Sequence, residues 1–152
     1  MLTLITDTRE KNPWTFANQD VQIINQKLDT GDYSLEGLEH EVCIERKRSI
    51  TEIANNITTK RFSDELIRMG RIRYPFLLLE FAIDDILAFP VNSGIPRTKW
   101  RQLRVNSGFI LKYLTEIPFK YNVHVVYCND RDNAEIIAYH LLKQANNLVN
   151  NG

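Results

Sequence analysis

The order of apolar and polar positions predicts a series of short strands. Residues 2–6 alternate apolar and β-branched side chains and stop at the polar run 7–10, which predicts a strand that ends in a loop. The run 76–81 is the most apolar stretch and predicts a central strand. Further strands are predicted at 21–27, 33–35, 41–47 and 123–127.

Helical signals occupy much of the remaining chain. Ser49 and Glu52 fit a capping box that opens a helix, and a second helix with apolar residues at helical spacing closes at Gly70. Pro96 predicts the start of a long helix that runs to about Glu116.

A final helix is expected to begin with an acidic cap formed by Asp132 and Glu135. Its apolar stripe consists of Ala134, Ile137, Ala138, Leu141, Ala145 and Leu148. Early antiparallel strands, followed by strands that alternate with helices, predict an α/β domain whose mixed central sheet is flanked by helices. At 152 residues with 43% apolar residues, we expect one domain over 1–148 and a polar tail at 149–152.

Charge is balanced overall but unevenly distributed. The 19 basic and 19 acidic residues cancel, so neither disorder nor indiscriminate polyanion binding is indicated. Residues 1–45 carry 3 basic and 9 acidic side chains, whereas residues 46–112 carry 13 and 6. An acidic first third beside a basic middle is what a metal site next to a phosphate-binding surface needs.

The two cysteines and the hydropathy profile indicate a reduced, soluble, intracellular protein of the nucleus or cytoplasm. Cys43 and Cys128 stand among apolar residues and are expected to be core side chains rather than a metal pair or a disulfide. No apolar run approaches a membrane span, so no membrane partner is expected.

The most informative positions are Asp32 and the run that ends in Glu45, Arg46 and Lys47. On a strand, Glu45 and Lys47 project to the same face and Arg46 to the other. If the preceding strand pairs with this one, Asp32 lies near Glu45, and the two carboxylates would hold a hard divalent cation such as Mg²⁺. A bound cation activates water and neutralises charge on phosphate, which phosphodiester hydrolysis requires.

Each of these residues also has an ordinary structural explanation. The charged run at 45–47 would discourage edge pairing at a solvated strand end. Asp32 would be a turn residue after Gly31, and Asp7 with Glu10 would be a helix-capping pair. The joint occurrence of several acids at strand ends, with a lysine two residues after one of them, favours catalysis.

Three runs resemble the nuclease domains of the XPF and Mus-type family of structure-specific endonucleases. They are Asp7 to Glu10, Gly31 to Tyr33, and Ile44 to Lys47. The family motif is G-D, a variable spacer, E-R-K and, three residues further, an aspartate. The resemblance implies a restriction-endonuclease-like core, a Mg²⁺ or Mn²⁺ cofactor, and hydrolysis of branched DNA such as flaps, forks or junctions in DNA repair, recombination or viral DNA processing.

The resemblance also implies roles for individual residues. Asp7, Asp32 and Glu45 would be acidic active-site residues and metal ligands, Lys47 the catalytic lysine, and Glu10 and Arg46 supporting residues of the centre. The chain departs from the motif at Thr51, where the family has aspartate. Glu52 follows directly, and it either substitutes for that acid or serves only in the Ser49 capping box.

Two basic clusters are candidates for phosphate contacts. The expected substrate-binding residues are Lys60, Arg61, Arg97, Lys99, Arg101 and Arg104. Arg61 is the best of them, because the family has basic residues after the catalytic helix. For the cluster at 97–104, a solvated helix face is the competing interpretation. No base-reading motif is present, so recognition is expected to depend on nucleic-acid shape and backbone charge.

Three functions remain open from the sequence. The first is an active structure-specific endonuclease without an organic cofactor, and the second is an inactive nuclease-like module for dimerisation or DNA docking. The third is a restriction or general repair nuclease that cuts linear duplex as readily as branched DNA. A homodimer would use the helices after residue 96.

Overall fold

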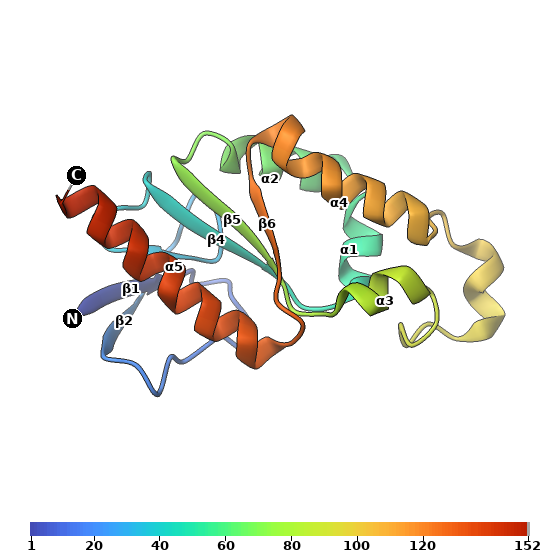
Figure 1. Cartoon of the computed structure of the whole chain (residues 1–152), viewed down its shortest axis with the longest axis horizontal. Helices are drawn as coiled ribbons and strands as arrows, with labels where there is room; N and C mark the ends of the chain where they lie inside the picture. The colour runs from blue at the N-terminus through green and yellow to red at the C-terminus, as the bar shows by residue number, and fades with distance from the viewer. Residues whose placement is uncertain (152) are drawn as a thin grey trace.

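The computed structural model describes residues 1–151 and contains a six-stranded mixed sheet flanked by helices (Figure 1). The strands are β1 (Leu2–Thr6), β2 (Val21–Asn25), β3 (Tyr33–Leu35), β4 (Val42–Lys47), β5 (Tyr74–Leu79) and β6 (His124–Tyr127). Their order in the sheet is β2-β1-β3-β4-β5-β6. Each strand lies within two residues of its predicted bounds, which confirms the α/β class.

Strand directions divide the sheet into two parts. β1, β3 and β4 are antiparallel neighbours, as predicted, while β4, β5 and β6 are parallel. The expectation of antiparallel early strands is wrong for β2, which pairs with β1 in parallel. A parallel pair needs a long crossover, and residues 7–20 provide it, anchored by the buried Trp14 and Phe16.

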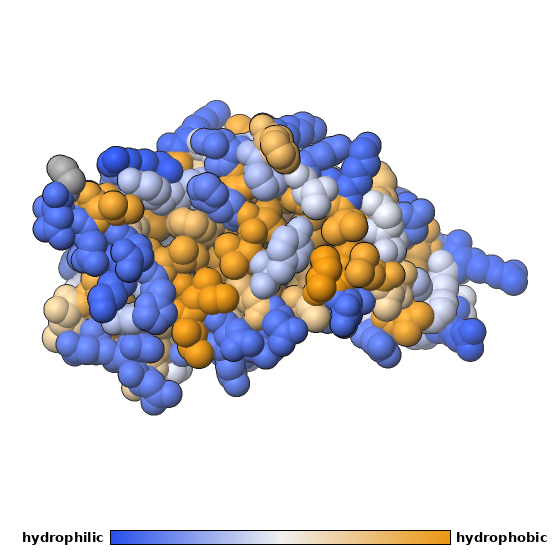
Figure 2. Space-filling view, viewed as in Figure 1, coloured by the Kyte–Doolittle hydropathy of each residue, from blue (hydrophilic) through white to orange (hydrophobic). Residues whose placement is uncertain are grey.

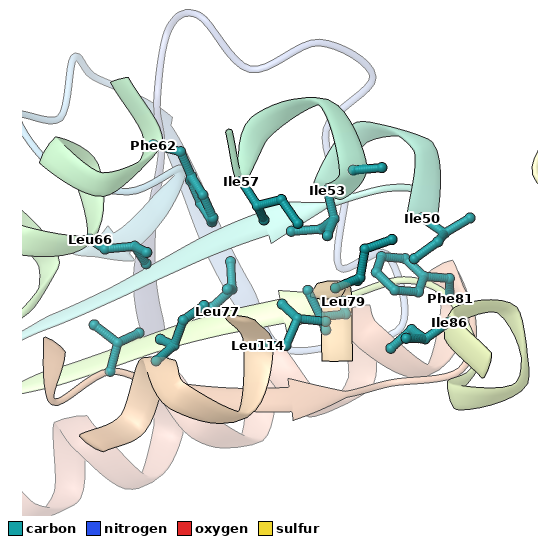
Figure 3. Packing of buried hydrophobic residues seen from close by; sticks show 14 of the residues in the cluster. Ile50, Ile53, Ile57, Phe62, Leu66, Leu77, Leu79, Phe81, Ile86 and Leu114 are labelled. Carbon is teal, nitrogen blue, oxygen red and sulfur yellow. The ribbon is translucent and has the colours of Figure 1, made fainter. Parts of the chain in front are cut away.

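The helices are α1 (Ile50–Asn56), α2 (Lys60–Met69), α3 (Ile83–Ala88), α4 (Ser107–Tyr121) and α5 (Arg131–Asn151). Ser49 caps α1 by accepting a hydrogen bond from the Glu52 amide at 3.1 Å. Thr59 caps α2 in the same way, through the Phe62 amide at 3.3 Å. The apolar faces of α1 and α2 pack on the side chains of β5, as Figure 3 shows for Leu77 and Leu79.

The predicted helix from 96 to 116 is replaced by two shorter elements. A 3-10 helix, η1, spans Arg97–Gln102, and α4 begins only at Ser107. Between them Leu103 is extended and Val105 is buried against the core. The Asn106 side chain then accepts a hydrogen bond from the Phe109 amide at 2.8 Å. Burial of Val105 and this N-cap separate α4 from η1, so the basic residues at 97–104 do not lie on one continuous α-helix.

The last helix also differs from its prediction at both ends. Its cap is Asp130, whose carboxylate accepts a hydrogen bond from the Asn133 amide at 2.8 Å, rather than Asp132. α5 then runs to Asn151, so residues 149–151 continue the helix. Gly152 lies outside the described residues.

Two hydrophobic cores lie on opposite faces of the sheet. One joins α1 to α4 and contains Cys43, and the other joins α5 to the 7–20 crossover and contains Cys128. Both cysteines are free and buried, as predicted, and burial raises the pKa of Cys43 to about 12. Four aromatic side chains are also buried: Trp14, Phe16, Phe81 and Phe89. Within residues 1–151, no helix combines the length and apolar content needed to cross a membrane.

Candidate active site

The ends of β1, β3 and β4 bring three predicted acids to the same edge of the sheet. The Asp7 amide donates to the Asp32 carbonyl at 2.8 Å, and the Asp32 amide donates to the Ile44 carbonyl at 2.7 Å. Asp7, Asp32 and Glu45 therefore follow one another across adjacent strands. Backbone hydrogen bonds, rather than side-chain packing, set this order.

Gly31 allows the close approach of the Asp32 turn to β4. Its φ of +83° lies in the left-handed region that glycine favours. A Cβ at this position would lie 3.0 Å from the Cys43 Cβ and 3.1 Å from the Ile44 carbonyl oxygen. Glycine is required here for both reasons, and it fixes the position of the next residue, Asp32.

A cavity of about 450 Å³ opens over these strand ends and is covered from one side by α1 and α2. Most of its lining is charged. The predicted residues that line it are Asp7, Glu10, Asp32, Glu45, Arg46, Lys47, Glu52 and Arg61. The structure thus gathers every acid and the lysine proposed from the sequence around one space.

Glu45 and Lys47 project from β4 toward α1 and α2, as strand alternation predicts. The Lys47 ammonium lies 4.0 Å from Glu45 Oε2 and 5.0 Å from the centre of the Phe62 ring. Burial against this apolar surface lowers the pKa of Lys47, although the carboxylates of Glu52 and Asp32 act in the opposite direction. The ammonium is therefore partly desolvated and loosely paired.

Asp32 is a half-buried carboxylate in the same cavity as this ammonium. Its Oδ2 accepts a hydrogen bond from the Arg46 amide at 2.9 Å. Burial raises the pKa of Asp32, while that amide and the charge of Lys47 lower it. A carboxylate in this environment gains stability when a cation binds to it.

Asp7 is more completely satisfied by protein donors. It accepts hydrogen bonds from the Leu28 amide at 2.7 Å and from Arg9 Nε at 2.9 Å. Burial acts to raise the pKa of Asp7, but these hydrogen bonds and the charge of Arg9 outweigh it and the pKa is lowered. Asp7 is thus ionised and already held by its neighbours, in contrast to Asp32.

Arg46 lies on the opposite face of β4 and anchors the crossover loop. Its Nε donates to Glu80 Oε2 at 2.7 Å, and its Nη1 donates to the Asn12 carbonyl at 3.1 Å and contacts Glu10 at 3.4 Å. Trp14 stacks on the guanidinium at 4.7 Å and donates its indole N–H to the same Glu80 oxygen. Arg46 and Glu10 therefore belong to one network that ties the crossover loop to β4 and β5.

Thr51, the position that departs from the motif, makes a structural hydrogen bond. Thr51 donates its hydroxyl to the Ser93 carbonyl at 2.8 Å, which ties α1 to the loop before η1. Glu52 accepts a hydrogen bond from the Arg48 amide at 2.7 Å and also lines the cavity. Glu52 thus serves in the N-terminal cap of α1, and its side chain also lies at the cavity.

The predicted basic residues fall into separate groups. Arg61 lines the charged cavity, but Lys60 is exposed and pairs with Asp64 at 2.8 Å. The group from Arg97 to Arg104 lies on and after η1, at the end of the molecule beyond α3 (Figure 1). There Lys99 lines a second hollow of about 580 Å³, together with Thr51 and Ser93.

Sequence reasoning missed two acids that belong to this region. Glu80 follows the buried β5 and pairs with Arg46; a charge directly after an apolar strand was the available signal. Glu65 lies on α2 between Arg61 and Arg68, and all three line the cavity. Their spacing of four and three residues places them on one helix face, which the sequence already contained. Burial and the nearby Asp32 raise the pKa of Glu65 to about 7.

The donor set suits a hard divalent cation, although the acids are not tightly preassembled. Among residues 1–151, no three acidic, histidine or cysteine side chains are close enough together to enclose an ion. The cavity nevertheless offers carboxylate oxygens from Asp32 and Glu45, and a buried Glu65 oxygen that has no hydrogen-bond partner. Oxygen donors of this kind fit Mg²⁺ or Mn²⁺, which retain several waters.

The fold is an α/β domain with a charged cavity at one edge of its mixed sheet. The structure superimposes on XPF from Aeropyrum pernix with a TM-score of 0.70 and 17% identity, covering 95% of this chain and 65% of that one. For the same protein in complex with DNA, the TM-score is 0.71 with 17% identity, and the coverage is 96% and 66%. The ERCC4 domain family model matches residues 6–140, so the chain belongs to this nuclease family.

One curated relative agrees with this assignment. The 3'-flap repair endonuclease Xpf of Saccharolobus solfataricus is 29% identical over 142 residues. The match covers 90% of this chain and 53% of that protein. The chain therefore spans about half the length of this relative.

Proposed function

We propose that this chain is a metal-dependent DNA endonuclease domain that hydrolyses phosphodiester bonds in branched DNA. The observation that carries the proposal is the meeting of Asp32, Glu45 and Lys47 at one cavity edge. The related Xpf is described as a 3'-flap repair endonuclease, and a structurally similar XPF is known in complex with DNA. We place the activity inside the cell, in DNA repair, recombination or viral DNA processing.

Each residue has a distinct part in the proposed reaction. Asp32 and Glu45 would hold Mg²⁺ or Mn²⁺, with Asp7 beside them. Such a cation, when bound, lowers the pKa of water and neutralises charge on the phosphate. Lys47, whose ammonium is partly desolvated and loosely paired, orients the attacking water or donates to the phosphate oxygens.

Substrate recognition would depend on backbone charge. Arg61 lies at the cavity and is exposed, so it can contact the phosphate next to the scissile bond. The exposed residues Arg97, Lys99 and Arg101 on η1 form a second positive area beyond α3. Two separated positive areas fit a substrate with two arms better than a single short duplex.

A cleavage panel tests the proposal. End-labelled flap, fork, junction and linear duplex substrates are incubated with the protein and Mg²⁺ or Mn²⁺. We expect incision of a branched substrate that requires metal and that Asp32→Asn and Lys47→Ala remove. Asp64→Asn, an exposed acid on α2, is the matched control and retains activity. Intact branched substrates with both metals would contradict the proposal, and equal cutting of linear duplex would favour a general nuclease.

An inactive DNA-docking module is the second candidate. The observation that favours it is Thr51, which binds the Ser93 carbonyl where the motif has an acid. Calorimetric titration with Mn²⁺ separates the two functions, because an inactive module has no need to bind the metal. Binding that Glu45→Ala abolishes would support the enzyme, whereas DNA binding without metal binding would support the module.

We also propose a homodimer formed through the C-terminal part of the chain. Figure 2 shows apolar side chains gathered between α5 and α4, over β6, and continuing toward α3. The exposed apolar residues on these elements are Ile83, Leu87, Phe109, Phe119, Tyr127, Ile136 and Leu148. Exposed apolar patches of this extent mark interaction surfaces. A monomeric mass in light scattering at micromolar concentration would exclude the dimer.

A further inference from the structure

Glu65 reaches the charged cavity from a different layer of the fold than the other acids. Asp32 and Glu45 belong to the sheet edge, whereas Glu65 lies on α2, which covers the cavity from the helix side. It also lines a smaller adjoining hollow of about 210 Å³ next to Lys47. The cavity therefore has carboxylates on two of its walls.

One oxygen of the Glu65 carboxylate has no hydrogen-bond partner among residues 1–151. This oxygen, Oε1, is buried. Arg61 and Arg68 stand four residues before and three residues after it, at the spacing where helical ion pairs form. Within residues 1–151, neither arginine comes within ion-pair distance of it, whereas the neighbouring Asp64 pairs with Lys60 at 2.8 Å.

An unpaired carboxylate in a buried position reduces stability. The charges of Arg68 and Arg9 offset this cost only in part, and the charge of Asp32 adds to it. The arrangement is unfavourable for the protein alone and becomes favourable when a cation enters the cavity. Residues that break local stability rules in this way are typical of functional sites.

We propose that Glu65 binds the divalent cation of this cavity from the α2 side, directly or through one of the cation's waters. The inference rests on the proposed metal site of Asp32 and Glu45. Mg²⁺ and Mn²⁺ prefer six oxygen ligands and keep several waters, and those waters need acceptors that orient them. Glu65 supplies such an acceptor from the helix layer, whereas Asp32 and Glu45 belong to the sheet.

Mn²⁺ binding to the full chain tests this inference without reference to cleavage. Electron paramagnetic resonance measures free Mn²⁺ during titration of wild type, Glu65→Gln, Asp64→Asn and Asp32→Asn. Loss of an outer acceptor weakens metal binding by about 10-fold or more, so we expect this change for Glu65→Gln. Asp64→Asn removes the same charge from the next position on α2 and is expected to bind like wild type.

Thermal unfolding supplies a second readout. In EDTA, Glu65→Gln is expected to unfold at the same temperature as wild type or higher, because an unpaired carboxylate has been removed. The rise in unfolding temperature caused by Mn²⁺ is expected to be smaller than in wild type. If Glu65→Gln does not fold, Glu65→Asp, which retains the charge but is one methylene shorter, replaces it and is expected to weaken Mn²⁺ binding.

The outcomes separate this inference from the proposed function. If wild type binds Mn²⁺ and Asp32→Asn abolishes binding, but Glu65→Gln binds like wild type, the role of Glu65 is overturned while the metal site stands. Equal weakening by Asp64→Asn also overturns it, since the effect would then be general charge. If wild type binds no Mn²⁺, or Asp32→Asn binds it unchanged, the proposed metal site fails and the role of Glu65 fails with it.

Discussion

The two faces of β4 bury charge in opposite ways. On one face, Arg46 is held by Glu80, the Asn12 carbonyl and Glu10, and its side chain is 1% exposed. On the other face, Lys47 is 10% exposed and its nearest carboxylate oxygen lies 4.0 Å away. The strand thus carries a closely bound cationic side chain on one side and a loosely bound one on the other.

This difference in pairing distinguishes a structural role from a role in the proposed reaction. A buried ion pair with short hydrogen bonds cannot release its charge without a large loss of stability. A desolvated, loosely paired ammonium or carboxylate is ready to interact with a ligand and is stabilised when the ligand binds. We therefore assign the Arg46 face to structure and the face of Glu45 and Lys47 to the reaction, and the following variants test that assignment.

The largest effect is expected from Arg46→Met. This variant leaves the buried Glu80 without its guanidinium partner, whereas Glu10 keeps Arg48 at 3.1 Å. Uncompensated buried charge typically costs about 3–5 kcal/mol. Urea unfolding followed by circular dichroism measures the change. The double variant Arg46→Met with Glu80→Gln neutralises the orphaned acid and should recover part of the loss. A change below about 1 kcal/mol for the single variant would show that the Arg46 network is not structural.

Lys47→Met is expected to affect activity rather than stability. Removal of one preorganised electrostatic group costs about 10²- to 10³-fold in rate, so cleavage of a branched substrate should fall by this amount. The free energy of unfolding should be unchanged or higher, because burial already disfavours the Lys47 charge and lowers its pKa. Single-turnover cleavage and urea unfolding of the same preparation measure both quantities. Large destabilisation would instead indicate that Lys47, like Arg46, has a structural role.

The pKa of Glu65 predicts a pH dependence of the metal-free protein. Burial and Asp32 raise this pKa from 4.5 to about 7, so the folded state binds this proton more tightly than the unfolded state. Its contribution to the free energy of unfolding is complete below pH 4.5 and is lost as the pH rises through 7. In EDTA, wild type should lose stability relative to Glu65→Gln across this interval. Parallel stability curves for the two proteins would contradict the raised pKa.

The smallest effect is expected at the departure from the motif. Thr51→Asp restores the family acid but removes the hydroxyl that donates to the Ser93 carbonyl and places a carboxylate against that oxygen. We expect a loss of about 1–3 kcal/mol in the free energy of unfolding, measured by urea denaturation, and no gain in Mn²⁺ affinity. A stable variant with tighter Mn²⁺ binding would show that Thr51 had replaced a metal ligand.

Much of the fold was predictable because its signals are local. Apolar runs and turn residues placed all six strands, and the Ser49 cap placed α1. The failures came from interactions between distant segments. Val105 packs into a core built from residues far apart in the chain, which local sequence patterns do not reveal. Its burial and the Asn106 cap divide the predicted helix. The crossover that makes β2 parallel to β1 contains Trp14 and Phe16, whose burial is also a tertiary effect.

The site was predictable to the extent that it follows strand alternation. Glu45 and Lys47 share a face because they are two residues apart, and Asp32 follows from the turn before β3. The partners of Arg46 were not predictable, because Glu80 is 34 residues away along the chain. Likewise, local spacing placed Glu65 on a helix face with two arginines and favoured an ion pair. Only the packed structure shows that Oε1 of Glu65 has no hydrogen-bond partner among residues 1–151.

The close contact at Gly31 makes the position of the proposed metal-binding acids sensitive to an added methyl group. A methyl group there would press on the Cys43 Cβ and the Ile44 carbonyl, in a backbone region that other residues rarely adopt. To relieve the contact, the turn would have to move away from β4 and carry the neighbouring carboxylate with it. The spacing between Asp32 and the acids of the neighbouring strands therefore depends on a hydrogen atom in place of a side chain at Gly31. Even Gly31→Ala would displace Asp32 without altering any charged residue.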